Sequence, residues 1–320
     1  MPAGWGRLAV ALPVLAVLQL PPFLFNPLTE TWAVVLSLNF PWLSVCAVLG
    51  WAMGRGPQAQ PFPHYLAFLA FLVCPALPCT VRPTEPAAGR RVQRTHQFGQ
   101  WEPAAKVAVL AAAATAFDCL VMPHWLTGIL QSLALFCFTS LCLEVAAAAA
   151  SLVSGMPVLA PFNRPEFWGA QWNVVAGTTF RTTVYEPLCQ GLFAGQTAAA
   201  AAPWRRVVAM LATFAASGAV HELAFFHLTR RLSGRWFLFF TVQGPLLLAE
   251  AGLGRLCRQA GVQVPLPVRV ATATATVHML AHMLFFPDIV EAGVPRRMLH
   301  QLLPGGLCGG GGGTKLSTGG

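Results

Sequence analysis

The residues best placed for chemistry are His221 and Glu222, an ionisable pair inside the apolar run of residues 207–226. An ionisable side chain in the middle of a membrane span is costly, so its presence there favours a functional role. Imidazole is also the side chain best suited to proton transfer near neutral pH. The run therefore predicts a catalytic histidine that acts within the membrane on a lipid-soluble substrate. A buried histidine bonded to a neighbouring helix is the structural alternative.

Helical spacing predicts which neighbouring residues share a helix face with this histidine. Ser217 and Gly218 lie one turn before His221 on the same face, whereas Glu222 lies about 100° further round the helix. The small side chains leave room for a substrate or for another helix. Ser217 and Glu222 are accordingly candidate substrate-binding residues.

The spacing of the histidines and cysteines disfavours a metal centre. A zincin motif that began at His221 would need a second histidine where this chain has Phe225. His278 and His282 share a helix face, but the other histidines form none of the further boxes that a di-iron oxygenase would need. The nine cysteines show no zinc spacing, and no metal or cofactor is expected. Four of them lie in apolar runs and are interpreted as free thiols: Cys46, Cys119, Cys137 and Cys142.

Residues 161–190 differ from the apolar runs, because tryptophans recur at helical spacing among several polar groups, including Arg181. This pattern predicts an interfacial or re-entrant amphipathic helix, with Trp168 and Trp172 at headgroup depth. Asn173 in this segment carries both donors and an acceptor, so it could hold a carbonyl or orient an imidazole. A helix-surface amide in an interfacial segment is the plainer alternative. Trp168, Trp172 and Arg181 are further candidate substrate-binding residues.

The elements that position these side chains are membrane helices. The 320 residues are 56% hydrophobic and only 10% charged, whereas soluble proteins carry about 25% charged residues. The net charge of +9 is scattered between apolar runs, which does not favour nucleic-acid binding. We expect an all-α, polytopic integral membrane protein with one domain over residues 1–303 and a disordered, Gly-rich tail over 304–320. Roughly eight spans are predicted, at about 8–25, 31–53, 63–80, 106–122, 125–153, 204–228, 236–254 and 267–286.

Three groups of residues resemble the signatures of plant wax synthases. Residues 167–173 (FWGAQWN) and 183–187 (TVYEP) resemble the FWGRRWN and TVYDP sequences of that family. Residues 217–223 (SGAVHEL) resemble its SGLMHEL sequence. The early Gly54-Arg55-Gly56-Pro57 loop and the late Pro287 also fit, and the motif region covers about residues 157–245.

The resemblance implies a membrane-bound O-acyltransferase (MBOAT-like fold), which is an all-helical bundle in the endoplasmic reticulum membrane with a buried reaction chamber. Members of that superfamily carry a fatty acyl group from acyl-CoA, a co-substrate, to a lipid hydroxyl. Wax synthases use a long-chain fatty alcohol and form wax ester. The catalytic histidine and asparagine of the family correspond to His221 and Asn173.

One departure from the family pattern concerns the donor. The paired arginines of FWGRRWN are Ala170 and Gln171 here, so any contact with the phosphates of CoA must come from other arginines. The candidates are Arg164, Arg181, Arg205 and Arg206. Two alternatives to wax-ester synthesis stay open: acyl transfer to a sterol or a diacylglycerol, and a non-enzymatic lipid or solute carrier.

Overall fold

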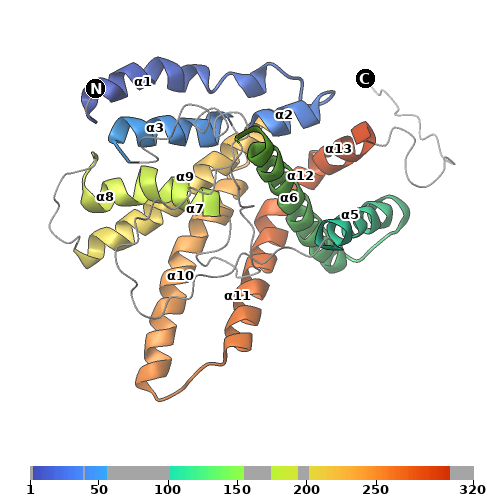
Figure 1. The fold of residues 1–320 in the computed structure, drawn as a ribbon. Helices are drawn as coiled ribbons and strands as arrows, with labels where there is room; N and C mark the ends of the chain where they lie inside the picture. Colours follow the sequence, from blue (N-terminus) through green and yellow to red (C-terminus); the bar gives the residue numbers. More distant parts are fainter. Residues whose placement is uncertain (1–2, 39, 56–100, 155–173, 194–201, 303–320) are drawn as a thin grey trace.

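The computed structural model describes residues 3–38, 40–55, 101–154, 174–193 and 202–302 (Figure 1). These parts of the chain contain helices and no strand, which confirms the all-α prediction. The α-helices are α1 (Trp5–Val17), α2 (Thr31–Ser37), α3 (Val45–Met53), α5 (Trp101–Cys119), α6 (His124–Ser154), α7 (Val174–Phe180), α8 (Glu186–Gln190), α9 (Pro203–Thr229), α10 (Arg235–Gln259), α11 (Leu266–Leu280), α12 (Phe286–Glu291) and α13 (Val294–Leu302). Four shorter helical turns are η1 (Pro21–Phe23), η2 (Phe40–Ser44), η3 (Arg181–Tyr185) and η4 (Ala281–Phe285).

Six stretches of helix in the described residues are long and apolar enough to cross a membrane, so the chain is a membrane protein. They are Trp5–Phe23, Thr31–Met53, Trp125–Cys142, Pro203–Thr229, Arg235–Gln259 and Leu266–Glu291. Two of the eight predicted spans are not among them. The span predicted at 106–122 corresponds to the shorter apolar helix Pro103–Phe117, and the one predicted at 63–80 lies outside the described residues, as does the tail.

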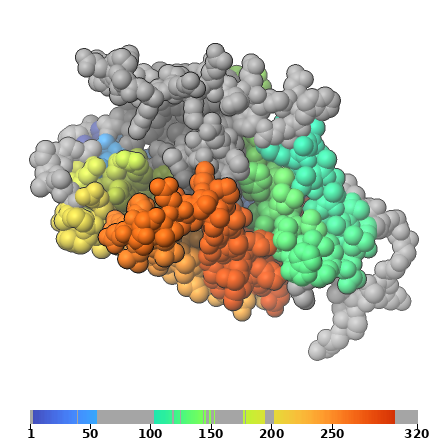
Figure 2. Space-filling view, turned by 90° about the horizontal axis from the view of Figure 1, so that it is seen from below, coloured from blue at the N-terminus to red at the C-terminus, as the bar shows by residue number. Residues whose placement is uncertain are grey.

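Helices α10 and α11 extend from the body of the molecule and are joined at their far end by residues 260–265 (Figure 1). Seen from that end, their tips lie between the start of α9 and the pair α5 and α6 (Figure 2). The outward side chains on the two helices are largely apolar: Leu253, Leu256, Leu266 and Val270 are each at least half exposed. Such surfaces suit a lipid surrounding, in which outward apolar side chains carry no penalty.

The best-packed core joins α9, α10 and the last membrane helix. Phe225 of α9 packs with Trp236 of α10, and the Trp236 ring stacks on Phe285 of η4 at a centroid distance of 4.1 Å. The indole N–H of Trp236 donates to the carbonyl oxygen of Phe285 at 2.9 Å. The α9–α10 hairpin is therefore fixed against α11, η4 and α12.

Three of the short turns, η2, η3 and η4, are π-helical, and each has a proline inside it or just after it. Pro41 lies within η2, while Pro187 and Pro287 follow η3 and η4 by two residues. Proline has no N–H to donate and its ring collides with the carbonyl four residues earlier, so the preceding turn widens. The prolines of the sequence motifs thus account for the local widening of two of these helices.

The cysteine interpretation needs one correction. Cys46, Cys137 and Cys142 are free thiols, as predicted, but Cys119 is disulfide-bonded. It is the last residue of α5, at the end of the apolar run, where another part of the chain can reach it. The apolar pattern around a cysteine predicts burial but carries no information about pairing.

Candidate active site

His221 lies in α9, and its two ring nitrogens differ in their hydrogen bonds. Its Nδ1 is 2.8 Å from the backbone carbonyl oxygen of Ser217, one turn earlier. A carbonyl oxygen can only accept, so Nδ1 carries the proton and Nε2 of the neutral ring has a free lone pair. None of the described residues is hydrogen-bonded to Nε2. The arrangement presents Nε2 as a proton acceptor, which is the form that a general base requires.

Aromatic rings surround this imidazole. Phe240 of α10 stacks on it, with the ring centroids 3.5 Å apart and the planes 20° from parallel. Trp42 of η2 lies 6.3 Å from it on another side and stacks in turn on Phe180, the residue before η3. Phe285 of η4 packs edge-on against Phe240. Each π-helical turn is thus linked to one of these rings: η2 contains Trp42, η3 directly follows Phe180, and η4 contains Phe285. Such turns are frequent at functional sites.

Gly218, one turn before His221, is where α9 and α10 come closest. A Cβ atom at this position would lie 2.6 Å from the carbonyl oxygen of Phe237 and 2.8 Å from Oγ1 of Thr241. The small residue in the SGAVHEL sequence thus accommodates another helix, which was one of the two interpretations of that spacing.

Glu222 points away from His221, as the helical spacing predicted. Its Oε1 accepts hydrogen bonds from the backbone N–H groups of Ser233, at 2.6 Å, and Gly234, at 2.8 Å. Its Oε2 accepts one from the N–H of Phe237 at 3.1 Å. Both carboxylate oxygens are therefore engaged with the first turn of α10. A contact between Glu222 and a substrate stays a prediction.

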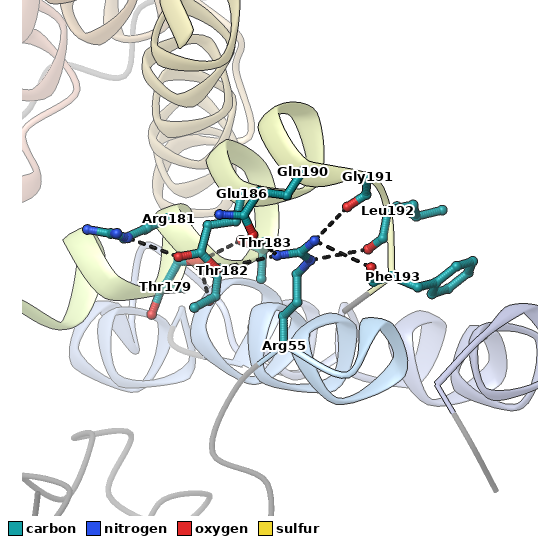
Figure 3. Close-up of polar contacts among 10 residues, drawn as sticks. All are labelled: Arg55, Thr179, Arg181, Thr182, Thr183, Glu186, Gln190, Gly191, Leu192 and Phe193. Carbon is teal, nitrogen blue, oxygen red and sulfur yellow. Dashed lines mark hydrogen bonds and ion pairs between the residues drawn. The ribbon is translucent and has the colours of Figure 1, made fainter. Parts of the chain in front are cut away.

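A second polar cluster joins two sequence motifs that are 131 residues apart, Arg55 of the early loop and Glu186 of TVYEP (Figure 3). Nη1 of Arg55 is 3.5 Å from Oε2 of Glu186, and the Arg55 side chain is only 6% exposed. The same guanidinium donates hydrogen bonds of 2.7–3.5 Å to Gln190, Gly191, Leu192 and Phe193. Arg55 therefore fixes α8 and the residues after it against the end of α3.

Arg181 is the exposed member of this cluster. Its Nε donates to Oε1 of Glu186 at 3.0 Å, while 70% of the side chain is exposed. Arg181 and Tyr185 line an open pocket of about 570 Å³ with Gly177, Met210 and Thr213. Burial raises the pKa of the Tyr185 phenol and Cys189 adds to this, whereas Arg206 and Arg181 act in the opposite direction. Two of the arginines named as possible phosphate ligands thus act on the phenol of Tyr185, and one of them, Arg181, lines the pocket with it.

Several predicted site residues lie outside the described part of the chain. They are Asn173, Trp168 and Trp172, together with the altered pair Ala170 and Gln171. Among the described residues the structure brings Ser217 to His221 through its carbonyl, and it places Arg181 at a pocket lined further along α9 by Met210 and Thr213. Sequence reasoning did not single out Phe240, which carries no signal beyond a hydrophobic position in a span.

Two other histidines of the membrane helices, His278 and His282, contact α6. His278 Nδ1 lies 2.9 Å from the hydroxyl of Ser132, and the His282 ring lies against Gly128, both on α6. No group of three or more potential metal ligands occurs within the described ranges. The i, i+4 spacing of these two histidines thus serves a helix contact.

Comparisons with known proteins point to one family. A model described as the membrane bound O-acyl transferase family matches residues 163–242. A long-chain-alcohol O-fatty-acyltransferase from Simmondsia chinensis is 26% identical over 92% of this chain and 84% of its own length. From Arabidopsis thaliana, a probable long-chain-alcohol O-fatty-acyltransferase is 25% identical over 92% and 84%, and an acyl-CoA–sterol O-acyltransferase is 24% identical over 94% and 87%. No solved structure is significantly similar to the chain.

Proposed function

We propose that this protein, a wax synthase-like membrane-bound O-acyltransferase, transfers a fatty acyl group from acyl-CoA to a long-chain fatty alcohol and so forms wax ester. The relatives named for this activity align over most of the chain. The observation that carries the proposal is the state of His221, whose Nδ1 proton is held by the Ser217 carbonyl so that Nε2 is left as a base. The carrier alternative has no comparable observation in its favour.

In the proposed mechanism the acyl group moves in one direct transfer, without an acyl-enzyme. The alcohol O–H donates to Nε2 of His221 while its oxygen attacks the thioester carbonyl carbon. As the carbon–sulfur bond breaks, the thiolate of CoA leaves and takes up the proton from the imidazolium. A positioned base of this kind typically contributes about 10²–10⁴-fold to the rate.

The apolar surroundings of His221 suit this reaction. The rings of Phe240 and Trp42 lie against the imidazole, with Phe180 stacked behind Trp42, and a site enclosed by apolar groups protects a thioester from hydrolysis. We further propose that Asn173 positions the reactants or stabilises the charge that develops on the thioester oxygen. The reaction uses acyl-CoA as co-substrate and needs no cofactor or metal.

Arg181 and Arg206 are the proposed contacts for the phosphates of CoA, in place of the family's arginine pair. Nε of Arg181 donates to Glu186, and Arg181 lines the open pocket with Tyr185. Guanidinium groups bind phosphate through paired, charge-assisted hydrogen bonds. The proposal also includes one acyltransferase domain over residues 1–303 and an endoplasmic reticulum location.

The test compares His221→Ala with the wild type and with His300→Ala, which changes an exposed histidine of α13. Each variant is expressed in a yeast strain that lacks neutral-lipid acyltransferases and is fed fatty alcohol. We expect wax ester from the wild type and His300→Ala, and none from His221→Ala at equal membrane abundance. Wax ester at the wild-type level from His221→Ala would contradict the mechanism.

A sterol acceptor is the second candidate, because a sterol O-acyltransferase is similar over almost the same span of the chain. The same yeast cells contain sterol and diacylglycerol. Steryl ester or triacylglycerol in place of wax ester would therefore replace the proposed acceptor and keep the reaction class. No new ester of any kind would favour a carrier.

A further inference from the structure

Glu222 connects the first turn of α10 to the helix that carries His221. The N-terminal N–H groups of a helix have no partners within it, and a carboxylate there is also favoured by the helix dipole. Gly234 and Phe237 direct two of these groups at the Glu222 carboxylate, and Ser233, just before the helix, directs a third N–H at it. Gly234, the residue before α10, has φ 72° and no side chain with which to cap the helix itself. The Ser233 hydroxyl accepts the N–H of Arg235 at 3.0 Å, and the rest of the cap of α10 comes from Glu222 of α9.

The same turn of α10 sets the position of Phe240. Phe237, whose N–H binds Glu222, precedes Phe240 by three residues, which is nearly one helical turn and a rise of about 4.5 Å. The carbonyl oxygen of Phe237 faces Gly218 on the other side. Phe237 is therefore fixed by two residues of α9 that lie on either side of His221 in the sequence: Glu222 accepts its N–H, and Gly218 lies against its carbonyl oxygen. Phe240 can stack on the imidazole at 3.5 Å only in this helix phase.

We propose that Glu222 is a positioning residue for the reaction: by capping α10 it holds Phe240 against His221 and so keeps Nε2 aimed at the acceptor hydroxyl. This inference rests on the proposed role of His221 as the base. Glu222 itself takes no proton and contacts no substrate in this proposal, because all of its hydrogen bonds go to the backbone of α10. Of the adjacent pair, His221 thus takes part in the reaction and Glu222 fixes the structure around it.

The variant Glu222→Gln tests this role with little change in side-chain volume. An amide has one acceptor oxygen, so it can keep the bonds from Ser233 and Gly234 but must turn an NH₂ group toward the N–H of Phe237. A misplacement of about 1 Å at a reacting group can cost about 10²-fold in rate. For the purified enzyme we expect kcat to fall by about 10- to 100-fold, with the KM of acyl-CoA and of alcohol each changed by less than about threefold. Glu250→Gln, on the exposed part of α10, is the matched control and should keep the wild-type kcat.

Phe240→Leu supplies the second measurement, and it stands even where Glu222→Gln fails to accumulate. It should lower kcat in the same way, and the double variant should lose no more than the more impaired single variant, because both act on the placement of one ring. A changed KM with unchanged kcat in Glu222→Gln would mean that Glu222 binds substrate. Additive losses, or wild-type kcat in Phe240→Leu, would overturn the link through Phe240. His221→Ala is assayed beside these variants and must be inactive. Full activity of His221→Ala would overturn the proposed function and this inference together. The contrary results named for Glu222→Gln and Phe240→Leu would overturn this inference alone.

Discussion

Replacement of Gly218 by alanine is a one-methyl perturbation at the contact between the two helices that form the site. The added Cβ would lie 2.6 Å from the carbonyl oxygen of Phe237, well inside the 3.4 Å at which ordinary contact begins. That oxygen belongs to the backbone, so it cannot rotate aside as a side chain could. The helices must separate, and overpacking of this kind costs about 1–3 kcal/mol of stability.

The same separation moves Phe240 away from His221, because Phe240 lies less than one turn beyond Phe237. With a displacement approaching 1 Å at the base, we expect kcat to fall by roughly 10- to 100-fold. The loss should be larger than the drop in thermal stability alone explains at the assay temperature. Ester synthesis from labelled acyl-CoA and fatty alcohol, normalised to the monodisperse protein recovered in detergent, measures the effect.

Gly252 provides the control for this prediction. It lies in α10, the helix that packs against Gly218, and a Cβ there would meet nothing within 4 Å. Gly252→Ala should therefore keep full turnover and gain a little helix stability, about 0.5–1 kcal/mol. Wild-type kcat for Gly218→Ala at normal abundance would refute the reasoning, because it would mean that the α9–α10 distance does not control the base.

Three further substitutions test contacts away from His221, each read as the thermal midpoint in detergent. In Arg55→Lys the ammonium group cannot reach the several acceptors that the guanidinium holds, so the change should cost about 2 kcal/mol or more of stability. Arg231→Lys, at an exposed position, should cost nothing measurable. Equal midpoints for the two variants would contradict the role of Arg55. Lys106 of α5 forms an ion pair with the partly buried Glu144 of α6, so Lys106→Met should destabilise by about 1–3 kcal/mol, and Glu144→Leu in the same chain should restore most of the loss. Trp236→Phe removes the donor to a buried carbonyl oxygen and should cost about 1–3 kcal/mol; an unchanged midpoint would show that this oxygen finds another donor.

The local features of the site were predictable from the sequence because they depend on spacing within one helix. The i, i+4 relation put Ser217 and His221 on one face, and the structure confirms it with the bond between them. The outward direction of Glu222 followed from the same geometry. Neither its three donors nor the ring of Phe240 could be predicted, since they depend on how α10 returns against α9.

The hydrophobic periodicity of the sequence does not predict which side chains of distant segments meet. Arg55 and Glu186 were each noted within a motif, but nothing in either motif indicates that the two side chains meet. Six of the eight predicted spans are confirmed, and the one at 106–122 corresponds to a shorter apolar helix, because an apolar run such as that of α5 predicts a helix without fixing whether it is long enough to cross. The π-helical turns at Pro41 and before Pro187 and Pro287 could not be predicted from the prolines alone, because Pro13 and Pro245 lie inside regular α-helices.

These π-helical turns make the protein sensitive to the number of residues in a segment. Successive residues of an α-helix are rotated by about 100°, and a π-helical turn holds about one residue more than an α-helical turn. Deletion of one residue within η4 would let the helix close as a regular α-helix, and the residues after it would keep nearly their present direction, because the wider turn holds the extra residue over about the same rotation. The Phe285 ring would then be exchanged for a neighbouring side chain within the turn itself. At the three turns beside His221, a single-residue deletion should therefore change the rings near the imidazole and leave the packing of the following helices in place, whereas the same deletion in a regular part of α9 would rotate everything after it by about 100°.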